Sequence, residues 1–161
     1  MAVTTDIVAS YRGPRRVVRR LLAAGANEGR ALAILMAGCA VTFVAQWPRL
    51  AREAHFSGED VYPLLGGALL AWLFIAPLAF YALAFAAHLA CRALGGAGDG
   101  FAARMALFWS WLAASPLLLL NGLVAGFIGP GPALTLVGAL WLGVFAWFLV
   151  STLREAQWGR R

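Results

Sequence analysis

The sequence predicts an all-α membrane protein, a polytopic bundle of transmembrane helices. Long apolar stretches alternate with short loops that hold almost every charge. The chain is 62% hydrophobic and only 12% charged, whereas a soluble domain is about 25% charged. Its mean hydropathy is +0.78. Inside lipid each stretch must be helical, because an unpaired backbone group there costs several kcal/mol.

The first element is an N-terminal arm, residues 1–29, with a basic amphipathic helix predicted at residues 14–25. Proline is tolerated in a first helical turn and glycine often ends a helix, which fits Pro14 and Gly25. At about 100° per residue, one arc holds arginines and the opposite arc holds aliphatic residues. The two sets are Arg15, Arg16, Arg19 and Arg20, and Val17, Val18, Leu21 and Leu22. Such a helix suits the cytoplasmic headgroup layer and anionic lipids; a docking helix for a partner protein is the alternative.

Four spans are predicted after this arm, and a short tail at residues 154–161 follows them. The spans lie at residues 30–47, 61–94, 104–128 and 132–153. Each is long enough for a hydrocarbon core of about 30 Å, which takes about 20 helical residues. A chain of 161 residues therefore forms one membrane domain, without a separate soluble one.

The second stretch is longer than a bilayer requires. Its 34 residues would measure about 51 Å as one helix, and Pro77 lies near the middle. One interpretation is a single helix kinked at Pro77. The other is two helices of about 16 residues, below the usual length of a span, which gives five spans. We favour four, because a split leaves no polar turn and opposes the arginine distribution.

Small residues recur at four-residue spacing on three of the predicted spans. Helices in lipid associate through close packing at such residues, so these ladders are predicted to seal the bundle internally. A homodimer contact is the alternative. The ladders are Ala82, Ala86 and Ala90; Gly122 and Gly126; and Thr135, Ala139 and Gly143.

The arginines predict the orientation of the chain. All thirteen basic residues are arginine, and eleven of them lie in, or within three residues of, the N-terminal arm, the second loop or the tail. The first loop, residues 48–60, contains only Arg49 and Arg52, with three acidic residues. By the positive-inside rule both termini should face the cytoplasm, as in a multi-pass protein of a bacterial inner membrane.

No constellation for catalysis, cofactor binding or metal binding is found in the sequence. No aspartate, glutamate or arginine lies deep in a predicted span, where ionisable groups usually mark function. His88 and Cys91 share a helical face, but a metal site needs three or four ligands. The glycine-rich segment at residues 95–100 lacks the lysine and hydroxyl residue of a phosphate loop. We therefore expect a protein that is not an enzyme, with no cofactor and no nucleic-acid partner.

Four segments carry a resemblance to a known family. They are Arg-Ala-Leu-Ala-Ile-Leu-Met-Ala at 30–37, Phe-Val-Ala-Gln-Trp-Pro-Arg-Leu-Ala-Arg-Glu-Ala-His at 43–55, Arg-Met-Ala-Leu-Phe-Trp at 104–109 and Leu-Val-Ala-Gly-Phe-Ile-Gly-Pro-Gly-Pro-Ala at 123–133. The pattern resembles bacterial YIP1-family membrane proteins of the alphaproteobacterial type. The resemblance implies a small integral membrane protein with five spans. Eukaryotic relatives associate with Rab GTPases, but their Asp-Leu-Tyr-Gly-Pro motif is only loosely matched at 59–63, so no functional residue transfers.

These observations favour a non-enzymatic accessory or scaffold protein, which packs beside a larger membrane complex or organises lipid. Its expected partners are anionic headgroups at the cytoplasmic face, a membrane protein, or a second copy of the chain. The alternative is a small oligomeric transporter or channel component. In that case Pro77, Pro116 and Asn121 would bend helices around a site at the bilayer midplane.

Overall fold

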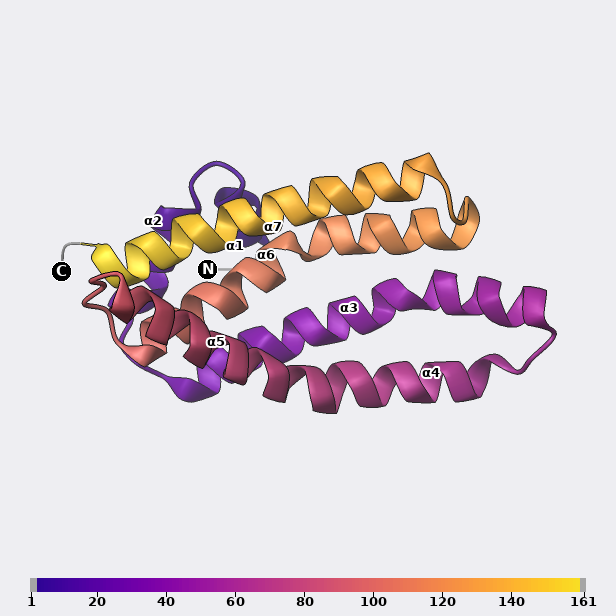
Figure 1. Cartoon of the computed structure of the whole chain (residues 1–161), viewed down its shortest axis with the longest axis horizontal. Helices are drawn as coiled ribbons and strands as arrows, with labels where there is room; N and C mark the ends of the chain where they lie inside the picture. Colours follow the sequence, from indigo (N-terminus) through magenta and orange to yellow (C-terminus); the bar gives the residue numbers. More distant parts are fainter. Residues whose placement is uncertain (1–2, 160–161) are drawn as a thin grey trace.

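The computed structural model describes residues 3–159, which form helices joined by short turns (Figure 1). Four helical segments are long and apolar enough to cross a membrane, which confirms the predicted all-α bundle. They are α3 (Glu28–Ser57), the continuous α4–η1–α5 segment (Val61–Leu70, Ala71–Ile75, Ala76–Ala93), α6 (Gly100–Phe127) and α7 (Pro132–Trp158). Two short helices precede them, α1 (Val3–Ser10) and α2 (Pro14–Ala23).

The bundle has two different ends. The terminal end is where α3 begins, α7 ends and residues 94–99 connect α5 to α6; the distal end carries the turns at 58–60 and 128–131 (Figure 1). Short polar side chains start three of the helices. Asn27, Asp60 and Asp99 accept hydrogen bonds from backbone N–H groups of α3, α4 and α6, which satisfies donors that have no partner inside the helix.

The first span continues beyond its predicted end. The prediction that residues 48–60 form a loop is wrong, because α3 runs through Pro48 to Ser57 and ends at the left-handed Gly58 (φ 71°). Proline removes one backbone hydrogen bond from a helix interior. Here Leu50 and Ala54, one turn apart and both buried, continue the packing face of α3. The connection to α4 is therefore only residues 58–60.

The second stretch is a single span, as favoured from the sequence. It runs from Val61 to Ala93 and contains a π-helical turn at Ala71–Ile75, just before the buried Pro77. Proline cannot donate to the carbonyl four residues earlier, and its ring clashes there. A wider π turn absorbs this mismatch, so the helix bends without breaking. The five spans implied by the YIP1 resemblance do not appear among the described residues.

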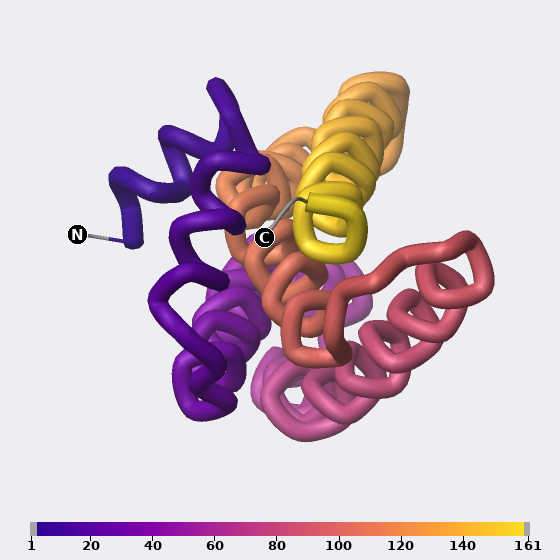
Figure 2. The backbone as a smooth tube through the Cα atoms, turned by 90° about the vertical axis from the view of Figure 1, so that its left-hand side faces the viewer, coloured from indigo at the N-terminus to yellow at the C-terminus, as the bar shows by residue number. Residues whose placement is uncertain are grey.

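Helix α6 is the centre of the molecule. Viewed from the terminal end, the other helices surround its first half (Figure 2). From Phe101 to Ser115 every residue of α6 except Arg104 is buried. Beyond Pro116 much of α6 is exposed. The part of α7 beside it contacts the bundle with one side and is exposed on the other. The best-packed core thus lies toward the terminal end.

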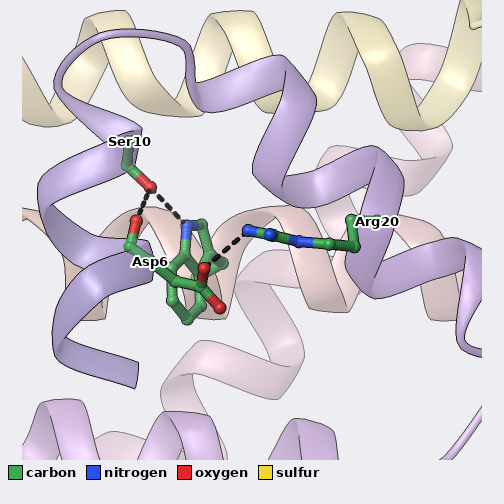
Figure 3. A network of polar contacts seen from close by, with 4 residues as sticks. Asp6, Ser10 and Arg20 are labelled. Carbon is green, nitrogen blue, oxygen red and sulfur yellow. Dashed lines mark hydrogen bonds and ion pairs between the residues drawn. The ribbon is translucent and has the colours of Figure 1, made fainter. Parts of the chain in front are cut away.

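Helices α1 and α2 lie beside the bundle and cross α6 and α7 steeply (Figure 3). The predicted α2 is present, but its aliphatic arc does not enter lipid. Val17 and Val18 are 2% and 0% exposed and belong to the same core as Met105 and Phe108 of α6. Hydrophobic packing on protein, and not lipid insertion of this arc, therefore holds α2 in place.

Candidate functional site

Several polar side chains inside the spans make hydrogen bonds within a helix or between helices. The hydroxyls of Ser110 on α6 and Thr152 on α7 lie 2.9 Å apart, and both also bond backbone carbonyls. Thr42 donates to the carbonyl of Gly38 at 2.8 Å. Asn121 makes a long 3.5 Å hydrogen bond to the carbonyl of Leu134, which links α6 to α7. Such bonds between or within helices serve packing.

Within residues 3–159 no group of three or more His, Cys, Asp or Glu side chains is placed to hold a metal ion. His88 is half-buried near the terminal end and its Nδ1 atom has no hydrogen-bond partner. It lines a small hollow with Arg92 and the glycine-rich segment. Cys91 is a free, buried thiol.

The glycine-rich segment, residues 95–100, is tied to the end of α7. The N–H groups of Ala97 and Gly98 both donate to the carbonyl of Gln157, at 2.9 and 3.2 Å. A side chain at Gly98 would meet the backbone of Ala156 and Gln157. Because these amides already have an acceptor, the segment connects two helices and does not present a cradle for phosphate.

The Gly122 and Gly126 ladder forms a close seam between α6 and α3. A Cβ atom at Gly122 would collide with the backbone of Ala45, and one at Gly126 would collide with Pro48. At the distal end of the seam, Arg52 of α3 donates to the carbonyl of Gly126 at 3.1 Å and lies over the Phe56 ring. The structure thus places this ladder inside the bundle.

The other two ladders lie on the outside. Ala82, Ala86 and Ala90 are exposed on α5, and Thr135, Ala139 and Gly143 are exposed on α7. Nothing lies within 4 Å of a Cβ atom built at Gly143. Within one chain these residues therefore do not seal the bundle, contrary to that part of the sequence interpretation. They leave a row of small residues exposed on α5 and another on α7.

A cluster of aromatic rings around Trp111 joins the spans in the middle of the molecule. Trp111, on α6, is 7% exposed. Its ring centroid lies 4.7 Å from Phe80 on α5, 5.9 Å from Trp72 on η1, and 5.7 and 5.6 Å from Trp141 and Phe145 on α7. The opposite helix makes room for it, because a Cβ atom at Gly38 of α3 would lie 2.7 Å from this indole. The sequence identified the tryptophans but not this partnership.

The N-terminal helices are fixed by a polar network (Figure 3). The indole N–H of the buried Trp109 donates to the hydroxyl of Ser10 at 2.9 Å, and that hydroxyl donates to the carbonyl of Asp6. The Asp6 carboxylate pairs with Arg20 of α2 at 2.5 Å. Burial raises the pKa of the Tyr11 hydroxyl. Helix α1 was not predicted, since eight residues with weak amphipathicity give little sequence signal.

The four arginines predicted to bind lipid or a partner have different surroundings. All are exposed on α2. Arg19 pairs with Glu155 of α7 at 3.6 Å and Arg20 with Asp6, whereas Arg15 and Arg16 form no ion pair with the described residues. Arg104 and Glu28 form a further ion pair at the terminal end. Arg160 and Arg161 of the predicted tail lie outside the described residues.

No protein-family model matches this chain, and no curated protein or solved structure is similar to it.

Proposed function

We propose that the chain is a non-enzymatic accessory protein of a bacterial inner membrane, which binds a transmembrane helix of a partner through the exposed ladder on α7. One observation carries this proposal: Thr135, Ala139 and Gly143 form a small-residue face that no part of the described chain covers. Small residues let helix backbones approach closely, and close packing drives association in lipid. Polar side chains of the spans already join helices within the chain, as Ser110 and Thr152, and Asn121, join α6 to α7, which supports a role in packing and not in catalysis.

The test introduces bulk on this face without disturbing the bundle. Gly143→Leu is expected to reduce, by tenfold or more, the amount of partner that co-purifies with the tagged protein in mild detergent, measured by quantitative mass spectrometry. The matched control is Gly67→Leu on α4, another helical glycine with nothing within 4 Å of a built Cβ atom. The control should retain the partner. Migration of the wild-type protein as a lone monomer would contradict the proposal, as would equal loss in both variants.

The orientation is a second part of the proposal. With four spans, the arm and the tail lie on the same side of the membrane, and eleven of the thirteen arginines lie on that side. The positive-inside rule places that side in the cytoplasm. A reporter active only in the cytoplasm, fused after residue 161, should be active, and a single cysteine at Ser57 should react with an impermeant thiol reagent added outside. A C-terminal reporter active only in the periplasm would reverse the assignment.

A further inference from the structure

The terminal end of the bundle contains a cleft between α1 and α2. It has a volume of about 500 Å³, within the roughly 300–1,000 Å³ range of small-molecule sites. Arg12, Arg16 and Arg20 line it from the α2 side, while Val8 and Ala9 of α1 line the opposite side. Thr5 also lines the α1 side, so three guanidinium-bearing residues share one cleft with a wall of small and aliphatic side chains.

The cleft carries an excess of positive charge. Arg20 is engaged by the Asp6 carboxylate, which belongs to α1. Arg12 and Arg16 are exposed and make no ion pair with residues 3–159. Guanidinium groups offer several donors in a planar fork that matches phosphate oxygens. An anion in the cleft would therefore meet donors from more than one arginine.

The depth of the two helices indicates where this cleft lies in the membrane. Helix α2 is level with the end of α7, through the Arg19–Glu155 pair. Helix α1 lies deeper, because Ser10 contacts Trp109, five residues or about 7.5 Å beyond Arg104. The exposed face of α1 is mixed: Val8, which is 64% exposed, lies beside Ala9 and one helical turn after the exposed Thr4 and Thr5. Arg12 follows Tyr11, whose ring packs on Phe148 of α7, seven residues or about 10.5 Å before Glu155. The cleft thus lies beside the spans, at the level where we expect headgroups to meet acyl chains.

We propose that the α1–α2 cleft binds the phosphate of an anionic phospholipid headgroup. The arginines bind the phosphate, and Val8 of α1, which lines the cleft and is exposed, contacts the upper part of an acyl chain. A lipid fits this cleft better than an acidic peptide does, since the cleft lies beside the spans, below the level of Glu155, and the exposed Val8 is part of its lining. The inference is independent of the partner face on α7, because the two sites are formed by different helices.

The experiment uses the full-length protein in neutral phosphatidylcholine nanodiscs that contain a small fraction of spin-labelled phosphatidylglycerol. The motionally restricted signal reports labelled lipid in contact with the protein, and its excess over the same signal from spin-labelled phosphatidylcholine gives the relative association constant. The double variant Arg12→Gln/Arg16→Gln should lower the relative association constant about tenfold or more, since the cleft then loses two groups that donate charge-assisted hydrogen bonds to the phosphate. The control Arg15→Gln/Arg154→Gln removes the same charge outside the cleft and should change the constant less than threefold.

Each other outcome decides against the proposal. Equal losses in the two double variants would show general electrostatic attraction, without a site. Displacement of the labelled lipid by millimolar inorganic phosphate or glycerol phosphate would show a site for the free anion. An unchanged constant combined with binding of a polyglutamate peptide would assign the arginines to a protein partner.

A second variant tests the same site. Val8→Glu leaves every arginine in place and adds a carboxylate to the cleft, so it should also lower the constant. The test therefore holds even if one variant is unstable.

Discussion

Gly122→Leu is expected to prevent the chain from forming its native bundle. Any side chain at this position of α6 would collide with the backbone of Ala45 on α3, and backbone atoms cannot move aside as a flexible side chain can. Overpacking of a core commonly costs about 1–3 kcal/mol, and here two helices would have to separate. Size-exclusion chromatography of a heated fluorescent fusion in detergent should show a large drop in apparent melting temperature, or no monodisperse protein.

Helix propensity alone would make Gly122→Leu stabilising, opposite to the destabilisation expected from packing. Replacing glycine in a helix by a better helix former stabilises the helix by up to about 1 kcal/mol, so a net loss at Gly122 must come from packing. Gly67→Leu has the same propensity gain and meets no neighbour within 4 Å. Its melting temperature should stay at or above that of the wild type. If Gly122→Leu melts like Gly67→Leu, α3 and α6 do not pack as described.

The sequence predicted the number and approximate position of the spans because both depend on a summed property. Hydropathy over about 20 residues is hardly affected by any single residue, and the polar turns stand out against it. The boundaries depended on local signals that tertiary contacts can override. Pro48 indicated a helix end, yet Leu50 and Ala54 remain buried beyond it and the helix continues. Pro77 was correctly expected to bend a continuous helix, although the π turn itself has no sequence signature.

The candidate surfaces were harder to predict for a different reason. A spacing of four residues shows which residues share a helix face, but not what that face meets. Gly122 faces α3 and Gly143 faces away from the described chain, although their sequence patterns are alike. In a soluble protein, polarity would separate the two faces. In a membrane protein the lipid is as apolar as the core, so this signal is absent.

Helix α2, which carries the four arginines, is a second case in which the sequence pattern does not show what a helix face contacts. Its two arcs were correctly recognised, but an aliphatic arc suits lipid and a protein core equally well. Val17 and Val18 are buried against α6 because α1 and α2 lie beside the bundle. In addition to this packing, Ser10 of α1 accepts a hydrogen bond from Trp109, 99 positions away in the sequence. No local pattern connects two such residues.

Trp111→Ala is expected to destabilise the bundle strongly. The residue contacts rings on η1, α5 and α7 and fills the space left by Gly38 on α3. Removal of a buried tryptophan from a core costs about 3–5 kcal/mol. For a chain of this size, 1 kcal/mol corresponds to about 2–4 °C, so the apparent melting temperature should fall by about 10 °C. Trp147→Ala, at a position 48% exposed, should shift it by only a few degrees.

The conservative variant Trp111→Phe separates the two properties of this side chain. The indole N–H of Trp111 is buried and has no hydrogen-bond partner, and an unsatisfied buried donor costs about 1–3 kcal/mol. Phenylalanine keeps a ring among the four aromatic neighbours and removes that donor, so part of the lost packing is offset. Trp111→Phe should therefore lose less than half of what Trp111→Ala loses in the same melting experiment. If phenylalanine is as damaging as alanine, the indole N–H has an acceptor in the membrane, and the aromatic cluster is held by that hydrogen bond as well as by its rings.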